Sequence, residues 1–292
     1  MDLGSIGRTL HRLRKAANLS HEELAANICP PQAVKEIEEG KSYPSVDILE
    51  KLGEKMGLKI NIFFDVSEST SSTYIEAVQQ IIRKYIRNRE YKSIGLIVER
   101  EMNNPLFQTP FHLQFLKWHE GISIYYNSGN VQQAIDVLWE AIDLTKVDTN
   151  VWTEREIEIL NSIGVIYYEE QRFHEAYETY YKAYGRLESL PFIKNSQIKI
   201  RVLYGLSQTL SEMGKYHESL VYSNRGIDMC IESETMYLLG ELNYQSGENY
   251  FKIGEEDKGI EFIESSKTVF FIQRNEKFID LVNNEMALLL KK

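Results

Sequence analysis

A set of related segments recurs through most of the chain and constrains the fold more than any other feature. Each of the five segments has a turn residue, two polar positions, one small or compact residue and then an amphipathic helical pattern. The compact residues are separated by 40, 42, 43 and 40 positions and are Ile94, Ala134, Ala176, Ser219 and Gly259. Self-similarity at this period is typical of helical solenoids.

Each recurring segment follows another helical pattern, so the repeating unit is a pair of helices. The preceding patterns occupy 74–88, 108–127, 153–170, 196–213 and 235–252, and a final helix is expected near 276–290. A small residue at the fixed position lets the two helices approach closely, and no pair buries its apolar face alone. The pattern resembles tetratricopeptide (TPR) repeats with longer helices. We therefore expect about five pairs in a right-handed TPR superhelix plus a C-terminal helix, with the first helix of each pair lining a concave channel.

The first 66 residues have the pattern of a separate small helical domain. Apolar residues recur at helical spacing over 6–17, Ser20 and Glu23 have the spacing of a capping box, and Pro31 suits the first turn of a third helix. This order of short helices is typical of a helix-turn-helix. The predicted fold is therefore all-α, with a helix-turn-helix domain and linker over 1–66 and a TPR-like domain over 67–292.

The second helix of a helix-turn-helix enters the major groove, where its side chains contact base edges. Here that helix has the sequence PQAVKEIEEG. Its outward positions are predicted to be Gln32, Ala33, Lys35 and Glu36, and Gln32 can pair with adenine. Lys35 and Lys41 are predicted to reach phosphates. The partner of this domain is expected to be double-stranded DNA.

Composition excludes several other classes of protein. The net charge is −10, and residues 67–292 contribute −9 of it, which argues against a polyanionic partner for the repeats. Cys29 and Cys230 are too few for a disulfide framework, and no metal-binding or catalytic motif is present. No apolar run is long enough to cross a membrane, and no secretory signal is visible. We expect a cytoplasmic protein without metal, cofactor or catalytic residues.

The stretch SHEELAANICPPQAVKEIEEGKSYPSVDILEKLGEKMGL resembles the DNA-binding domain of Xre-type regulators. Through NIC, IE-x-G, YPS and DIL it resembles more closely the PlcR-like peptide-pheromone receptors, quorum-sensing transcription regulators of Gram-positive bacteria. The resemblance implies a homodimer that binds DNA and a short signalling peptide in its repeat channel. The chain departs from the family at Glu36, where those proteins have a basic residue, so either altered specificity or lost DNA binding follows.

Several polar residues interrupt apolar surroundings in the predicted inner helices, and we take them as candidate peptide contacts. They are Asn161, Tyr204, Gln208, Asn243 and Gln245. Asparagine is a poor helix residue, and its amide can pair with both edges of a peptide backbone. The alternative is a hydrogen bond between helices within the array.

Arg87 and Arg89 form a cationic spot in the otherwise acidic repeat region. Arginine can grip a peptide C-terminal carboxylate through two parallel hydrogen bonds, although a solvated helix end is the competing interpretation. The resemblance places two lysines of peptide-binding function at these positions, an asparagine at Asn161 and a glutamine at Gln245. The chain departs from the family at Gly205 and Glu241, so a different peptide is implied.

Three functions remain open at this point. The first is a peptide-responsive transcription regulator that binds DNA as a homodimer. The second is a TPR protein-interaction regulator whose helix-turn-helix does not read DNA specifically. The third is a DNA-binding regulator in which the repeats only dimerise. DNA binding separates the first from the second, and peptide binding separates the first from the third.

Overall fold

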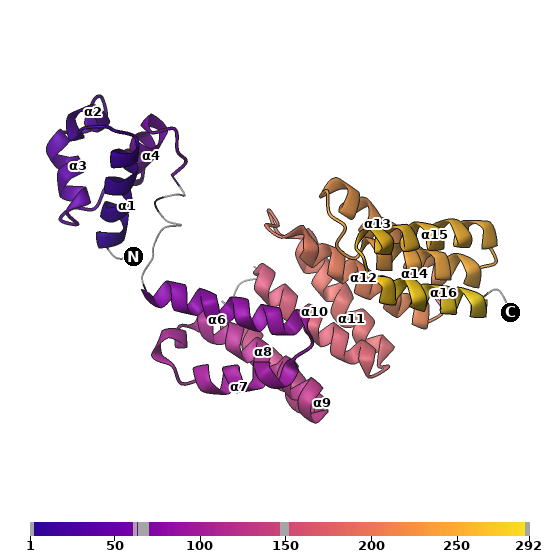
Figure 1. The fold of residues 1–292 in the computed structure, drawn as a ribbon. Helices are drawn as coiled ribbons and strands as arrows, with labels where there is room; N and C mark the ends of the chain where they lie inside the picture. Colours follow the sequence, from indigo (N-terminus) through magenta and orange to yellow (C-terminus); the bar gives the residue numbers. More distant parts are fainter. Residues whose placement is uncertain (1–2, 61–62, 64–69, 147–151, 290–292) are drawn as a thin grey trace. The chain divides into compact units, whose positions relative to one another are not determined.

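The computed structural model describes residues 3–60, 63, 70–146 and 152–289, and all regular structure in these ranges is helical (Figure 1). The chain divides into two compact units, Met1–Arg87 and Asn88–Lys292. The prediction of an all-α fold is confirmed. The domain boundary expected after residue 66 stays a prediction.

The first unit begins with four helices around one small core. They are α1 (Leu3–Ala16), α2 (His21–Ala25), α3 (Pro31–Glu38) and α4 (Val46–Lys55), and α6 (Thr70–Arg87) follows them. Helix α3 packs against α1 and α2, and α2 also contacts α4. Leu10, Leu24, Val34 and Leu52 are fully buried in this core, one from each of the four helices.

The helix starts of this unit lie where the sequence predicts them. The Ser20 hydroxyl accepts a hydrogen bond from the Glu23 amide at 3.0 Å, and the Glu23 carboxylate accepts one from the Ser20 amide at 2.7 Å. This reciprocal capping box satisfies two amides that the first turn of α2 leaves unpaired. Pro31 is the first residue of α3, and Ser45 caps α4 by accepting from the Ile48 amide. The two side-chain caps therefore belong to α2 and α4, and α3 begins at a proline, whose missing amide needs no partner there.

The second unit is an array of helix pairs. Its elements are α7 (Tyr91–Glu101), the 3-10 helix η1 (Pro105–Phe107), α8 (Pro110–Ser128), α9 (Val131–Asp143), α10 (Glu154–Glu169), α11 (Phe173–Glu188), α12 (Ser196–Glu212), α13 (Tyr216–Glu232), α14 (Leu239–Lys252), α15 (Glu256–Ile272) and α16 (Glu276–Leu289). Helices α8 and α9, α10 and α11, α12 and α13, and α14 and α15 pack as pairs. Contacts from α8 to α10, α10 to α12 and α12 to α14 make these the inner layer.

The five compact residues that define the repeat all lie in the core. Ile94, Ala134, Ala176 and Ser219 are fully inaccessible to solvent, and Gly259 is buried in α15. The expected pairing of 74–88 with the helix that starts at Tyr91 stays a prediction.

An aromatic ring packed against two glycines sets the distance between two repeats. Tyr180 of α11 is 3 % exposed. A Cβ atom at Gly164 of α10 would lie 2.7 Å from its ring, and one at Gly205 of α12 would lie 2.4 Å from its Cζ atom. The ring therefore occupies space that only glycine leaves free on both inner helices. Gly205 is therefore a packing position, where the Tyr180 ring leaves no room for a larger side chain.

We predict that Gly205→Ala lowers the melting temperature. The added methyl group overlaps the Tyr180 ring, which cannot retreat toward Gly164, and overpacking of this kind costs about 1–3 kcal/mol. Thermal unfolding followed by circular dichroism measures the change. The matched control is Gly185→Ala in α11, where an added Cβ meets no atom within 4 Å. That variant is expected to melt at or above the parent temperature, since alanine favours helix. Equal melting of the two variants would contradict the packing argument.

Candidate functional site

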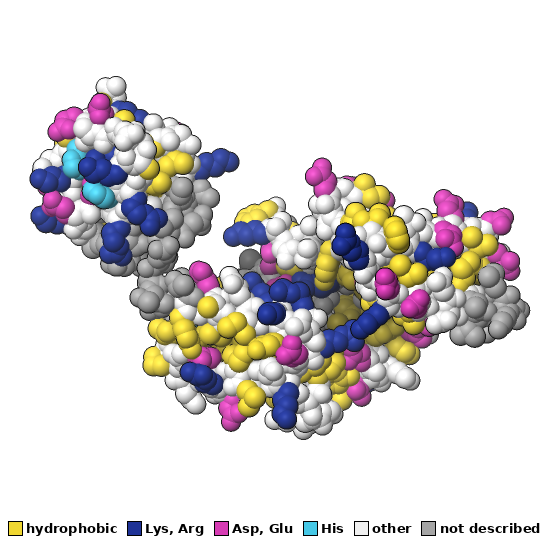
Figure 2. Space-filling view, viewed as in Figure 1, with side chains coloured by type: hydrophobic (Ala, Val, Ile, Leu, Met, Phe, Trp, Pro, Cys, Tyr) yellow, Lys and Arg dark blue, Asp and Glu magenta, His cyan; other side chains and the backbone are white. Residues whose placement is uncertain are grey.

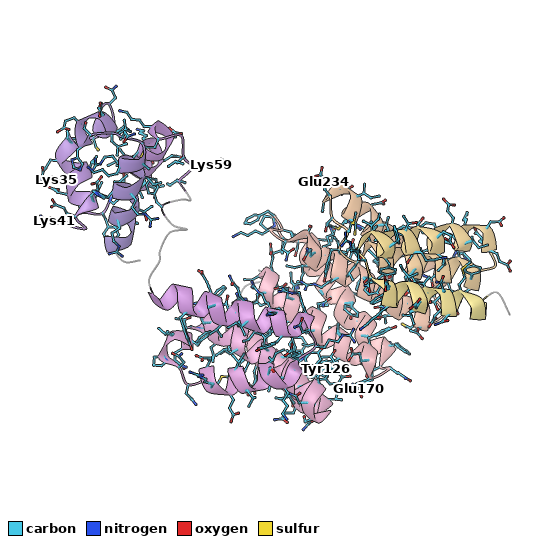
Figure 3. The ribbon with its side chains drawn as sticks, in the orientation of Figure 1. Lys35, Lys41, Lys59, Tyr126, Glu170 and Glu234 are labelled. Atoms are coloured by element: carbon cyan, nitrogen blue, oxygen red, sulfur yellow. The ribbon has the colours of Figure 1, made fainter. Side chains whose placement is uncertain are left out.

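The outward face of α3 carries the residues that the sequence predicts for DNA contact. Gln32 and Lys35 are exposed, and Ala33 and Glu36 are half-buried. The Gln32 Nε2 atom donates to Glu36 Oε1 at 3.1 Å. Lys41, just beyond α3, is exposed, and Figure 3 shows it on the same side of the unit as Lys35, with Lys59 on the opposite side.

The acidic residues of α3 do not all face outward. Glu38 points into the domain, where its side chain is only 6 % exposed, and Arg14 of α1 beside it is 4 % exposed. Arg14 donates to Glu38 from Nε at 2.6 Å and from Nη2 at 2.8 Å. His11 Nδ1 and His21 Nε2 lie 2.7 Å and 3.1 Å from Glu38 Oε2. Burial alone would raise the pKa of Glu38, but these hydrogen bonds outweigh it and lower the pKa to about 2.

This arrangement changes the charge that α3 presents. Glu38 is neutralised internally by Arg14, and Glu39 forms an ion pair with Lys41 at 2.6 Å. Glu36 is then the one acidic residue of the helix on its predicted outward face. On the visible face of the α1–α4 domain, lysine, arginine and histidine side chains lie together with several acidic ones (Figure 2). With Glu38 and Glu39 paired, the segment PQAVKEIEEG repels a phosphate backbone less than its three glutamates in sequence suggest.

We predict that Glu38→Gln destabilises the first unit by about 3–5 kcal/mol, because it leaves the buried Arg14 charge without its anion. In the parent protein the pKa of Glu38 is lowered from 4.5 to about 2 on folding. Its contribution to stability is therefore complete above pH 4.5 and is lost as the pH falls toward 2. Thermal unfolding from pH 7 down to pH 2 measures both effects.

The matched control is Glu39→Gln, on the neighbouring exposed residue, which is expected to leave the melting temperature at pH 7 unchanged. A Glu38→Gln protein that melts like the Glu39→Gln protein across this pH range would contradict the role of the ion pair.

A cavity of about 250 Å³ opens on the inner helices of the second unit. Its lining comes from α10, α12, α14 and α16, with one ring from α15. The lining residues are Tyr168, Tyr204, Gln208, Glu212, Glu241, Tyr244, Gln245, Glu248, Phe270, Phe278, Leu281, Val282 and Glu285. Three of the predicted peptide contacts, Tyr204, Gln208 and Gln245, are thus brought together in one place. We call this cavity the acidic aromatic pocket.

The other predicted peptide contacts do not line this pocket. Asn243 is 7 % exposed and donates to the Leu239 carbonyl at 2.7 Å within its own helix. Asn161 lies on α10, and its buried Oδ1 has no hydrogen-bond partner among the described residues. Arg87 and Arg89 are exposed, the first at the end of α6 and the second in the connection that follows it. The roles of these residues stay predictions.

Most residues that line the pocket were not predicted from the sequence, because the prediction considered only polar side chains among apolar neighbours. A signal was nevertheless present in the spacing. Glu212 lies one turn after Gln208, and Glu248 lies one turn after Gln245. Each glutamate therefore shares a helix face with a predicted peptide contact. Phe278 and Glu285 are seven positions apart, or two helical turns, so they also share one face of α16.

The carboxylates impose a negative potential on the rings of the pocket. Burial, then the charges of Glu212 and Glu248, raise the pKa of Tyr168 to about 12. Burial and nearby glutamates also raise the pKa of Tyr204 and of Tyr244 above its ordinary value. Burial raises the pKa of Glu241. The tyrosines therefore keep their hydroxyl protons and can act as hydrogen-bond donors.

A second polar cluster joins α8 to α10 away from this pocket. The Tyr126 hydroxyl donates to Glu169 at 2.8 Å, and the Tyr125 hydroxyl donates to Glu170 at 2.9 Å. Figure 3 shows Tyr126 and Glu170 at the same end of these helices. Tyr126 also stacks on Tyr91 of α7, with ring centroids 3.8 Å apart. Since these groups satisfy one another, we interpret the cluster as structural.

Comparison with protein families shows how this architecture is classified. The model of the RNPP family C-terminal domain matches residues 79–290, and a helix-turn-helix model matches residues 10–63. The chain belongs to the RNPP family. The matches cover the repeat array and the α1–α4 domain of this RNPP protein, so the predicted helix-turn-helix is confirmed. None of the curated proteins matches the sequence.

Several solved structures share the fold of this RNPP protein. PlcR of Bacillus thuringiensis in complex with the peptide PapR7 and DNA is 24% identical, covers 96% of this chain and 99% of its own, and has a TM-score of 0.81. ComR of S. thermophilus in complex with DNA and its signalling peptide ComS is 13% identical, covers 98% and 99%, and has a TM-score of 0.64. The pheromone receptor Rgg2 of Streptococcus dysgalactiae is 14% identical, covers 96% and 98%, and has a TM-score of 0.66. The predicted TPR-type superhelix is confirmed by these likenesses.

Three further properties concern the described part of the chain. No helix there combines the length and the apolar character needed to cross a bilayer. The described residues also include no group of three or more histidine, cysteine, aspartate or glutamate side chains placed to hold a metal ion. Cys230 is buried, with its Sγ atom 3.3 Å from the Tyr237 carbonyl oxygen, and burial raises the pKa of its thiol to about 11.

Proposed function

We propose that this RNPP protein is a cytoplasmic, peptide-responsive transcription regulator that binds DNA as a homodimer. The observation that carries the proposal is the pocket on the inner helices of the repeat array, where side chains from successive repeats converge. The same chain carries a helix-turn-helix domain before this array. Concave sites of this kind recognise extended peptides through convergent polar groups and rings. PlcR and ComR, which share the fold, have been crystallised with both a peptide and DNA.

The DNA-reading role rests on the exposed face of α3. Gln32 contacts base edges, and Lys35 and Lys41 contact phosphates in this proposal. The Glu39–Lys41 ion pair has to open for Lys41 to do so, and exposed pairs of this kind are weak. One short helix reads too few base pairs for useful specificity, so two copies of the chain act together on one operator.

The peptide-binding role rests on the inner helices. Tyr204, Gln208 and Gln245 supply ring surface and amides to the peptide. The Oδ1 atom of Asn161 is buried and unpaired, and in this proposal the side chain turns toward the ligand so that Oδ1 accepts from a peptide N–H group. Arg87 and Arg89 are proposed to hold the peptide carboxylate. Because binding linkage is reciprocal, peptide and DNA alter each other's affinity by the same factor.

The DNA-reading proposal predicts distinct effects for two residues of α3. Lys35→Ala is expected to weaken binding uniformly across sequences and to reduce the slope of log K against log salt by about one. Gln32→Ala is expected to lose about 1–3 kcal/mol of discrimination at one base pair. Selection from a random double-stranded DNA library, followed by anisotropy titrations at several salt concentrations, measures both. Lys59→Ala, on the opposite side of the unit, is the control and should leave both unchanged. Failure of the parent protein to enrich any sequence would contradict specific DNA reading.

The peptide-binding proposal predicts that Asn161→Ala weakens binding by about 1 kcal/mol without lowering the melting temperature of the free protein. The reason is that its buried acceptor is unpaired in the free protein, so its removal costs no native hydrogen bond. Selection of an unbiased octapeptide library on the full chain supplies the peptides, and calorimetry measures their affinity. A large fall in melting temperature would assign Asn161 a structural role instead.

The same peptides test the arginines. The double substitution of Arg87 and Arg89 by alanine is expected to abolish the preference for a free over an amidated peptide C-terminus. A parent protein that binds both forms equally would remove this role. Enrichment of no peptide from the library would contradict the proposed function as a whole.

A further inference from the structure

The acidic aromatic pocket has a composition that selects one kind of chemical group. Its walls contain five aromatic rings, those of Tyr168, Tyr204, Tyr244, Phe270 and Phe278. Four carboxylates, those of Glu212, Glu241, Glu248 and Glu285, also line it. The described lining residues include no lysine, arginine or histidine. A ligand that enters this pocket therefore meets ring faces and negative charge together.

The carboxylates differ in how far the protein already satisfies them. Glu248 pairs with Lys252 at 3.0 Å and accepts from Gln245 at 3.1 Å. Glu285 accepts from the Tyr244 hydroxyl at 2.9 Å. Glu212 and Glu241, in contrast, have no ion-pair partner within the described part of the chain.

Glu241 is the less accessible of these two unpaired carboxylates, since it is half-buried whereas Glu212 is exposed. Burial raises the pKa of Glu241, and the effect opposing it is a hydrogen bond from the residue's own backbone amide, not a positive charge. Its carboxylate is thus held in the pocket without a counter-ion from the protein.

This combination discriminates among ligand groups. An anion is repelled by the carboxylates, and a neutral apolar group gains only contact with the rings. A cationic nitrogen group gains twice, from a charge-assisted hydrogen bond to a carboxylate and from attraction to the ring faces. The volume of about 250 Å³ suits one terminal group of a ligand and not a whole peptide.

We propose that the acidic aromatic pocket binds a cationic nitrogen group of the ligand, with Glu241 as its counter-ion and the rings of Tyr204 and Tyr244 beside it. The group is either the free amino terminus of the peptide or the side chain of a lysine or arginine in it. The inference deepens the proposed function, on which it rests for the peptide nature of the ligand. It assigns the ligand a positive charge at the end that enters the C-terminal repeats.

Two matched pairs of small probes test the inference on the full chain. Nα-acetyl-argininamide and its neutral isostere Nα-acetyl-citrullinamide report on a guanidinium group. Phenylalaninamide and Nα-acetyl-phenylalaninamide, at pH 6.5, report on a free amino group. Ligand-observed NMR titrations give the affinities for the parent protein, Glu241→Gln and the control Glu261→Gln, an exposed glutamate of α15 outside the pocket.

We expect at least one cationic probe to bind about tenfold more tightly than its neutral partner. That preference should disappear in Glu241→Gln and persist in Glu261→Gln, and melting curves establish that both variants are folded. The pair that shows the preference identifies whether an amino terminus or a basic side chain is bound. Equal binding of charged and neutral probes, no binding of either cationic probe, or a preference that survives Glu241→Gln in the folded protein would overturn the inference.

The probes are single residues, so their outcome is independent of whether a longer peptide binds. A chain that keeps the cation preference but enriches no octapeptide would overturn the proposed function and leave the cation site standing. The opposite result is a chain that enriches octapeptides whose binding depends neither on a basic residue at a fixed position nor on a free amino terminus. That result would overturn the cation site and leave the proposed function standing.

Discussion

Close approach of helices at glycine and other small residues is the constraint on which the repeat unit depends. The Tyr180 ring packs where Gly164 and Gly205 leave room, and the fixed small positions Ala134 and Ala176 are fully buried. Each pair of helices is held tightly on its buried side, and the opposite face of the inner helices remains available for other side chains. The pocket lined by Tyr204, Gln208 and Gln245 occupies such a face.

The two units handle their acidic residues in opposite ways. In the first unit the Glu38 side chain is buried and paired with Arg14, and Glu39 is paired with Lys41. In the second unit Glu241 is half-buried at a cavity without a pairing cation among the described residues. The first arrangement reduces repulsion from a polyanion, and the second creates attraction for a cation. The uneven charge of the sequence is therefore only a partial guide to what each surface attracts.

The local features were predictable because they depend on neighbours in the sequence. The capping box of Ser20 and Glu23, the helical start at Pro31 and the burial of the repeat positions from Ile94 onward all follow from spacing alone. The composition of the pocket was only partly predictable. Tyr204, Gln208 and Gln245 were found because they are polar among apolar neighbours, whereas Tyr168 and Phe278 look like ordinary core residues. Their position at the pocket depends on how α10 and α16 are packed, which no local pattern specifies.

The inward ion pair of Arg14 and Glu38 has an evolutionary consequence for α3. The C-terminal end of this helix is anchored by Glu38, and the inward residues Val34 and Ile37 are buried. In the proposed function, substitutions that alter the choice of operator can accumulate at Gln32, Ala33 and Lys35, because none of these three side chains belongs to the buried core. Glu38 can change only together with its partner Arg14. Among related chains, residues at the beginning of α3 should therefore vary, whereas the residue at its end should stay the same.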